Sequence, residues 1–253
     1  MMNEMFKRMA AFEDHTDYCL PPETFIVARL DGHNFSNLTK RMKIEKPFDV
    51  RFRDLMVATT THVMKNTPFV CSYGYTESDE ISLLLRDSTH LFGRRIQKYT
   101  SLLAGMASAF FTHNMGGEEI AAFDCRVMAF PREDNVQDYF LSRMKDSERN
   151  ALNGWCYYTV LKETTADQAR GRLYRMSAAQ QHDLLFRHGI NYNNIDAWQK
   201  RGVGIVCSKY EKVGFNPVSG QEEIAIRSEY KPNFDLPYDA SYKEFIKSVM
   251  ESK

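Results

Sequence analysis

The sequence predicts an α+β fold: a ferredoxin-like antiparallel sheet, a packed helical lobe and a C-terminal β-hairpin. Apolar runs and helical periodicities follow one another in the order βαββαβ up to Pro131. After Pro131 the pattern is mainly helical, and two strand-like runs near the end flank a segment with two glycines and a proline. In a βαββαβ unit helices cover one face of the sheet, so we expect that arrangement here.

The first half of the chain supplies the strands and helices of this unit. The apolar runs predict strands at residues 24–30, 69–75, 80–85 and 122–130. Pro47, well suited to a first helical turn, precedes a predicted helix at 48–64. A second amphipathic helix is expected at 94–114, where Tyr99, Leu103, Met106 and Phe110 recur at helical spacing.

The second half is expected to form a lobe that packs on the sheet. We predict helices at 136–148, 150–161, 166–174 and 178–187, with Gly189 as a stop signal. A hairpin follows at 203–213 and 222–230, and a last helix at 241–251. No linker or repeat separates the parts. Residues 1–131 therefore form the expected catalytic core, and 132–253 pack on it to give one integrated domain.

Composition and charge argue against a protein that coats nucleic acid, a zinc-motif protein, and a secreted or membrane-anchored protein. The 253 residues include 33 Lys and Arg and 33 Asp and Glu, so affinity for a nucleic acid must come from a local patch. The five cysteines are widely spaced and form no Cys-x-x-Cys pair, which indicates a reduced protein without a zinc motif. Residues 1–15 lack the apolar core of a signal peptide, and no long uncharged apolar run follows. We expect a cytoplasmic enzyme with no membrane anchor.

Acidic residues stand at the ends of two predicted strands. Asp31 follows the first strand, and an acidic turn containing Asp79 and Glu80 joins the second strand to the third. In the βαββαβ topology the end of the first strand lies beside the start of the third, so these acids should meet. Asp31 and Asp79 would then bridge two Mg²⁺ ions about 3.5 to 4 Å apart, with the carbonyl of Gly32 as a further ligand. Glu80 could bind metal, orient a ligand or tune the charge.

The alternative meaning of these acids is conformational, because turns attract Asp and Gly without any function. Basic residues favour the functional interpretation. Lys46 precedes Pro47, and Arg94, Arg95 and Lys98 open a predicted helix, where they could hold a triphosphate. Such cations are unfavourable at a helix N-terminus unless an anion is bound, although solvated helix ends often carry them. The segment from Asp31 through Gly32, His33, Asn34 and Phe35 to Ser36 could wrap a nucleotide or be an ordinary turn.

Two further groups of residues are candidates for contact with nucleic acid. The segment Asn191-Tyr192-Asn193-Asn194 could touch RNA through amides and a stacking ring, or be a structural turn. Basic side chains of the lobe could follow a phosphate backbone, although a solvated helix face is the commoner meaning of such charges. These are Arg143, Lys145, Arg149, Arg170, Arg172 and Arg175.

In combination, these residues resemble the tRNA-histidine guanylyltransferases and their Thg1-like relatives, which extend RNA in the 3′-to-5′ direction. The resemblance spans most of the chain. It is carried by Arg29-Leu30-Asp31-Gly32-His33-Asn34-Phe35, Lys46-Pro47, Tyr73-Gly74, Ser78-Asp79-Glu80, Arg94-Arg95 through Lys98, Phe123-Asp124-Cys125-Arg126, and Leu185-Phe186 through Asn194.

The resemblance implies a core like the palm of ordinary polymerases, with two Mg²⁺ on Asp31, the Gly32 carbonyl and Asp79, and an essential acid at Glu80. It implies that ATP adenylylates an RNA 5′-monophosphate, that the 3′-hydroxyl of GTP or another NTP displaces AMP, and that pyrophosphate is later removed. Nucleotide contacts are implied for Arg29, Lys46, Ser78, Arg95 and Lys98. The implied partners are the 5′ end and acceptor stem of tRNA, bound by a homotetramer.

The chain departs from the specialists for histidine tRNA at two places. A family segment resembling His-Ile-Asn-Asn-Leu-Tyr-Asn is replaced by residues 148–154, and a family Lys is replaced by Gln181 or a neighbour. These departures put the usual ATP contacts in doubt and are similar to the Thg1-like branch, which repairs 5′-truncated tRNA by templated addition. The alternatives are a tRNA-His guanylyltransferase that adds G at position −1, a palm-type nucleotide cyclase or diguanylate synthase, and an RNA-binding module without catalysis.

Overall fold

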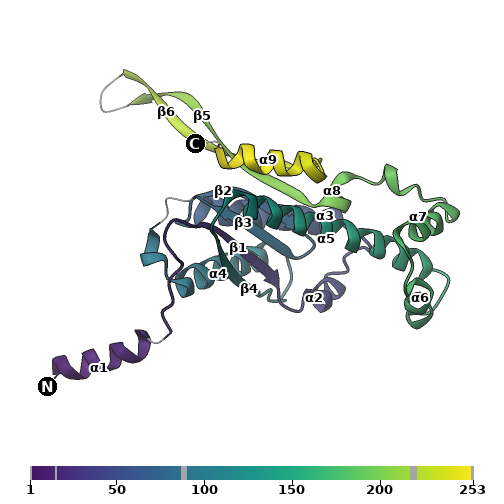
Figure 1. Cartoon of the computed structure of the whole chain (residues 1–253), viewed down its shortest axis with the longest axis horizontal. Coiled ribbons are helices and arrows are strands. Elements are labelled where there is room, and N and C mark those ends of the chain that lie inside the picture. Colours follow the sequence, from purple (N-terminus) through teal and green to yellow (C-terminus); the bar gives the residue numbers. More distant parts are fainter. Residues whose placement is uncertain (1, 15, 87–89, 217–220, 252–253) are drawn as a thin grey trace.

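The computed structural model describes residues 2–14, 16–86, 90–216 and 221–251. Its centre is an antiparallel sheet with six described strands in the order β4-β1-β3-β2-β5-β6 (Figure 1). The order of the first four strands is the one expected for the predicted βαββαβ unit. The strands are β1 Phe25–Gly32, β2 Cys71–Glu77, β3 Glu80–Leu85, β4 Phe123–Phe130, β5 Val203–Asn216 and β6 Gln221–Asn233.

Helices cover both faces of the sheet. On one face α3 (Val50–Asn66) and α4 (Ile96–Asn114) share a buried apolar cluster with β1 and β3, to which Val63 and Phe111 contribute. On the other face α5 (Glu133–Val160) and α9 (Asp239–Glu251) form a second cluster with β2, to which Phe140 and Tyr242 contribute. The predicted coverage of one face by the helices of the βαββαβ unit is therefore confirmed, and α5 and α9, which lie outside this unit, bury the opposite face.

A third apolar cluster forms the helical lobe beyond the sheet. The second half of α5 packs there with α6 (Ala166–Leu173), α7 (Ala178–Arg187) and the 3₁₀ turn η2 (Tyr192–Asn194). Figure 1 shows α6 and α7 at the far end of α5, away from the strands. The two helices predicted at 136–148 and 150–161 are one helix, because Ser147, Ala151 and Leu152 continue its buried stripe across the supposed break.

Some elements were not predicted, and some boundaries differ. The sequence did not indicate α1 (Met2–Asp14), α2 (Phe35–Arg41), the 3₁₀ turn η1 (Leu91–Arg94) or α8 (Ala197–Arg201). Helix α4 starts later than predicted because Gly93 and Arg94 have left-handed backbone, with φ of 61° and 60°. The hairpin strands are longer than predicted, and residues 217–220 of the predicted turn lie outside the described residues.

Over the described ranges, no helix of this chain is both long and apolar enough to cross a bilayer.

Candidate active site

The pairing of β1 with β3 brings the predicted acids together. Asp31 lies directly opposite Glu80 in the strand register. Next to this pair, the backbone N–H of Gly32 donates to the carbonyl oxygen of Asp79 at 3.1 Å. Asp124 of β4 lies opposite Asp31 on its other side. The predicted juxtaposition of Asp31 with Asp79 and Glu80 is therefore observed.

Asp79 stands in a two-residue loop between β2 and β3. Glu77 and Glu80 are the last paired residues of the hairpin, which leaves Ser78 and Asp79 to form its tip. Ser78 has a φ of 48°, the left-handed conformation that such tight loops require. The hydroxyl of Ser78 donates to Oδ1 of Asp79 at 3.1 Å, which fixes the direction of the carboxylate.

The carboxylates give this end of the sheet an excess of negative charge. Burial raises the pKa of Asp79, and the charge of Asp31 raises it further. Burial also raises the pKa of Glu77 to about 7, with Glu80 adding to the shift and Arg143 opposing it. A bound cation would offset the part of these shifts that comes from repulsion between the carboxylates.

The donor set fits a hard divalent cation. Asp31 is exposed, Asp79 is partly buried, and the carbonyl of Gly32 would add a neutral oxygen. Among the described residues, no three His, Cys, Asp or Glu side chains are arranged as a metal site. Protein ligands would thus be two carboxylates and a backbone oxygen, and such a set leaves positions for phosphate and water, as Mg²⁺ prefers.

Gly32 is required by a close approach. A Cβ atom at this position would lie 2.5 Å from Cγ of Phe35, well inside van der Waals contact. Phe35 begins α2 and is buried against Phe111 and Phe123, with ring centroids 5.1 and 4.9 Å away. The aromatic cluster therefore holds the turn after β1 directly against the strand that carries Asp31.

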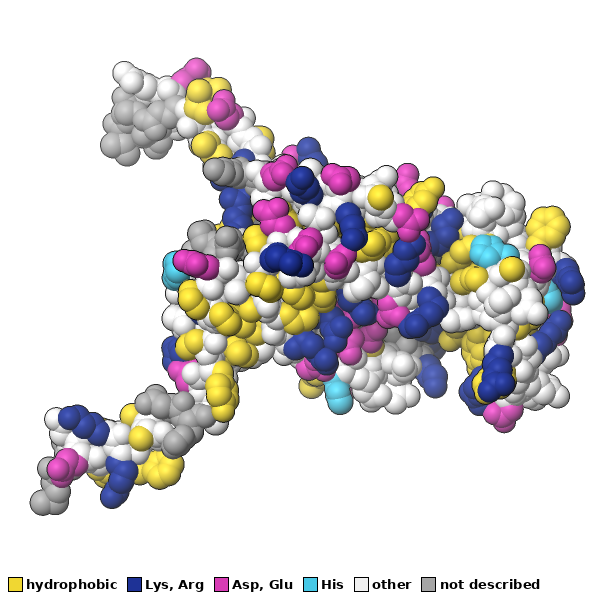
Figure 2. All heavy atoms as spheres, in the orientation of Figure 1, with side chains coloured by type: hydrophobic (Ala, Val, Ile, Leu, Met, Phe, Trp, Pro, Cys, Tyr) yellow, Lys and Arg dark blue, Asp and Glu magenta, His cyan; other side chains and the backbone are white. Residues whose placement is uncertain are grey.

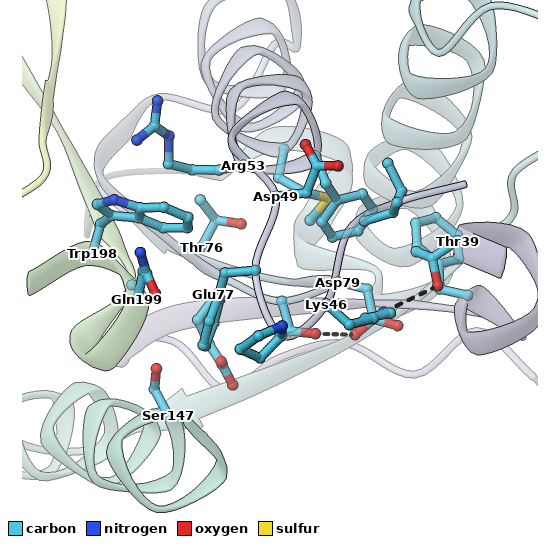
Figure 3. A pocket seen from close by; sticks show the side chains of 18 of the residues that line it. Thr39, Lys46, Asp49, Arg53, Thr76, Glu77, Asp79, Ser147, Trp198 and Gln199 are labelled. Atoms are coloured by element: carbon cyan, nitrogen blue, oxygen red, sulfur yellow. Dashed lines mark hydrogen bonds between the residues drawn. The ribbon is translucent and has the colours of Figure 1, made fainter. Parts of the chain in front are cut away.

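A pocket of about 150 Å³ opens beside Asp79. Of the predicted nucleotide-binding residues, Phe35, Ser36, Lys46, Ser78 and Asp79 line it. Figure 3 shows Lys46 and Asp79 together at one end, and Arg53 with Trp198 at the other.

The two ends of this pocket differ in chemistry. Nζ of Lys46 donates to Oγ1 of Thr39 at 3.4 Å, and burial lowers the pKa of Lys46 against the raising effect of Asp79. At the other end the guanidinium of Arg53 lies 4.7 Å from the ring centroid of Trp198. A cation beside an acid, followed by aromatic walls, suits the phosphates and the base of a nucleotide.

The remaining predicted residues are distributed unevenly. Arg29 lies two residues before Asp31, and its Nε is 3.9 Å from Oε2 of Glu80. His33 and Asn34 are exposed just after β1. The structure does not bring Arg95 to the acids, because it contacts Asp17 at 3.3 Å near the start of β1. Lys98 follows one helical turn after Arg95, at the same end of the sheet. Their role at the acids stays a prediction.

Sequence reasoning missed two parts of the site. Trp198, Gln199 and Gly202 form the far wall of the pocket, although they are distant in sequence from the acids. Arg143, a candidate for contact with a phosphate backbone or for a solvated helix face, instead turns inward and pairs with Glu80 at 2.7 Å. The one signal that pointed to the wall was Trp198, one of only two tryptophans in the chain.

The comparisons with known proteins agree with the resemblance. Two family models, described as tRNAHis guanylyltransferase and Thg1 C terminal domain, match residues 6–131 and 134–235. The tRNA(His) guanylyltransferase of Neurospora crassa is 31% identical over 269 residues, which cover 99% of this chain and 90% of that protein. The enzyme of the same name from Kluyveromyces lactis is 32% identical and covers 88% and 98%. The chain belongs to the tRNA-histidine guanylyltransferase (Thg1) family.

Solved structures extend the Thg1 comparison to three dimensions. A bacterial Thg1-like protein in complex with ATP matches with a TM-score of 0.75 and 25% identity, covering 97% of this chain and 99% of that one. A bacterial Thg1-like protein in complex with GTP matches with a TM-score of 0.75 and 26% identity, covering 98% and 99%. The predicted family is confirmed, and the chain is a Thg1-family nucleotidyltransferase.

The segment 148–154 and Gln181, the two places at which a departure from the histidine-specific Thg1 pattern is predicted, contact each other. Gln181 of α7 donates from Nε2 to Oδ1 of Asn153 on α5 at 2.6 Å. Asn153 and Gln181 line a second cavity of about 630 Å³ in the lobe, which is also lined by Lys145, Arg149, Lys200 and Arg201.

Proposed function

We propose that this chain is a 3′-to-5′ nucleotidyltransferase that activates an RNA 5′ end with ATP and adds template-matched nucleotides to 5′-truncated tRNA. One observation carries the proposal: Asp31 and Asp79 meet at the end of the sheet, beside a pocket with Lys46 at one end and Trp198 at the other. That arrangement suits the transfer of a nucleotidyl group. Membership of the Thg1 family adds support.

In this proposal the residues divide the work of holding a nucleotide. Asp31, the carbonyl of Gly32 and Asp79 would hold two Mg²⁺ ions, which would stabilise charge on the phosphates and make the attacking hydroxyl more acidic. Lys46 and Ser78 contact the triphosphate, Phe35 lines the pocket at the acidic end, and Trp198 confines the base. Arg29, His33, Asn34, Ser36, Arg95 and Lys98 remain predicted nucleotide contacts. The transition state of transfer is stabilised by such fixed charges.

The substrates ATP and GTP are proposed from the structural relatives. Bacterial Thg1-like proteins with the same fold have been solved with each of these nucleotides. The palm-like part, residues 1–131, would hold the metal ions and the phosphates, and Trp198 of the second part would complete the pocket. Residues 132–253 would contact tRNA and complete the single integrated domain, and a homotetramer would gather basic surfaces from several copies.

Residues of the helical lobe bear on the choice between templated repair and histidine-specific addition. The segment 148–154 and Gln181 or a neighbour are the predicted departures from the histidine specialists, and Asn153 of this segment accepts a hydrogen bond from Gln181. That favours repair guided by the acceptor stem, a duplex recognised by shape and backbone. The curated relatives at 31% and 32% identity are named for tRNA(His), which supports addition of G at position −1 as the second candidate.

A panel of RNA substrates tests the proposal. Purified protein, Mg²⁺ and ATP are incubated with each NTP and a 5′-monophosphorylated tRNA that lacks its first nucleotide, in versions that differ at the opposing template base. We expect addition of the NTP that pairs with this base, and of no other. Histidine tRNA without its extra G serves as the parallel substrate.

The outcomes are distinct. If G is added only to histidine tRNA and regardless of the template base, the second candidate is correct. A cyclic product formed from NTP alone, either a cyclic mononucleotide or a cyclic dinucleotide, would indicate a cyclase or diguanylate synthase. Without any product in either assay, the proposed function fails.

A further inference from the structure

We propose that Arg143 of α5 is a positioning residue that holds Glu80 in place and thereby fixes the loop carrying Asp79. The inference rests on the proposed function and deepens it, because it gives one side chain of the lobe-forming helix a part in the reaction. Arg143 does not reach the pocket lining, so its effect would pass through Glu80.

Glu80 is held on both carboxylate oxygens. Oε1 accepts hydrogen bonds from Nε of Arg143 at 2.7 Å and from Oγ of Ser82 at 3.4 Å. Oε2 lies 3.9 Å from Nε of Arg29. The hydroxyls of Ser82 and Tyr139 are 2.8 Å apart and continue the network to α5. With both oxygens engaged, Glu80 is bound in place by neighbouring side chains.

The clamp is sheltered from water. The side chains of Arg143 and Glu80 are only 18% and 10% exposed, so removal of either leaves a poorly solvated charge. Asp146 accepts from the other end of the guanidinium at 3.1 Å, and it also pairs with Arg149. Arg143 is thereby fixed between Glu80 and Asp146, whereas an arginine that binds RNA would be exposed and free of such ion pairs.

The geometry connects this clamp to the proposed metal ligands. Glu80 directly follows Asp79 and opens β3, opposite Asp31. The carbonyl of Asp79 holds the N–H of Gly32. A shift of Glu80 would therefore move Asp79 and the backbone beside Asp31 together. Small displacements of reacting groups cost large factors in rate, since a misplacement of 1 Å can cost about 100-fold.

The residues of α5 that surround Glu80 and Arg143 lie on one side of the helix. Tyr139, Arg143, Asp146 and Ser147 follow at spacings of four, three and one residues, which puts them on one side of the helix. The same helix continues into the lobe as one piece of 28 residues. The orientation of the lobe is consequently tied to the acids through Arg143.

A double-mutant cycle tests the proposal with the full chain. Nucleotide addition to truncated tRNA is measured for Arg143→Ala, Glu80→Ala and the double variant. We expect each single variant to lower kcat by about 10- to 100-fold with KM for NTP and RNA nearly unchanged. The double variant should equal Glu80→Ala, because Arg143 acts through Glu80. Arg143→Lys should recover part of the loss by restoring the charge.

The matched control is Arg132→Ala, which removes an exposed arginine that pairs with Asp134 at the start of the same helix and should leave kcat unchanged. Losses that multiply in the double variant would overturn the proposal. So would a raised KM for RNA at unchanged kcat in Arg143→Ala, since that result assigns the residue to RNA contact.

Hydrogen exchange supplies a readout that needs no activity. Arg143→Ala should speed amide exchange at residues 78–82, Glu80→Ala should do the same, and the double variant should add nothing. Unchanged exchange in Arg143→Ala would refute the clamp even if the wild-type chain proved inactive toward tRNA. Inactivity of the wild-type chain with the expected exchange pattern would instead reject only the proposed function.

Discussion

Gly32 joins the aromatic core to the acidic end of the sheet. Its lack of a side chain lets Phe35 pack against the strand, so Gly32→Ala should destabilise the fold by about 1–3 kcal/mol through overpacking. The expected fall in Tm is about 2–4 °C for each kcal/mol. Gly105→Ala is the control, because a Cβ there meets nothing within 4 Å and should be neutral or stabilising. Thermal melts of both variants check this, and equal Tm values would contradict it.

Glu77 should make stability depend on pH. Burial raises its pKa from 4.5 to about 7, so between these values the folded chain holds a proton that the unfolded chain has lost. Stability should therefore fall as pH rises through this window, by on the order of 3 kcal/mol. Glu77→Gln should remove that fall. Urea unfolding in EDTA at pH 5 and pH 8 measures the free energy of unfolding of the wild type and of Glu77→Gln. The same pH dependence in the wild type and in Glu77→Gln would contradict the prediction.

At the level of elements, β5 and β6 continue as a two-stranded ribbon beyond the body of the protein (Figure 1). Val213 and Phe215 share one face with Ile224 and Ile226, because Val213 lies opposite Ile224 and side chains alternate along each strand. Each of the four is at least 60% exposed. Figure 2 shows apolar side chains on this ribbon and on α1. An isolated hairpin of this kind is marginally stable. We therefore propose that a second copy of the chain packs against the apolar face of this ribbon.

Ile224→Glu should therefore weaken the proposed homotetramer. Burying the new carboxylate in an interface is costly, so the variant should appear as smaller species at micromolar concentration. Ile120→Glu changes another apolar side chain, 80% exposed and outside the ribbon, and should leave the assembly unaltered. Light scattering coupled to size exclusion measures both. A wild-type monomer, or a tetramer that survives Ile224→Glu, would contradict the prediction.

The elements differ in how far local sequence determined them. Strand 80–85 and helix 178–187 were predicted with their observed bounds, because apolar runs and capping residues mark them directly. Helix α5 was divided at Arg149 because polar residues there hide a buried stripe that only tertiary packing reveals. Helix α2 was missed because its seven residues depend on Phe35, which is fixed by contacts from α4 and β4.

For the whole molecule, topology explains what could be predicted of the site. The meeting of Asp31 with Asp79 and Glu80 followed from strand order alone. The inward turn of Arg143 and the wall at Trp198 did not, because α5 and α8 reach the acids from distant parts of the chain. Arg95 and Lys98 were predicted to lie near the acids, and they follow β3 closely in the sequence. The chain reaches them from the other end of β3, so they lie at the end of the sheet opposite the acids.

The measurement that bears most directly on the proposed site is 5′-end addition by the wild-type chain and by Asp79→Ala, with truncated tRNA, ATP, Mg²⁺ and the matching NTP. We expect template-matched extension by the wild type, a loss of at least about 100-fold in Asp79→Ala, and similar RNA binding by both. Extension by Asp79→Ala at the wild-type rate, or no extension by the wild type, would contradict a reaction centre at Asp31 and Asp79.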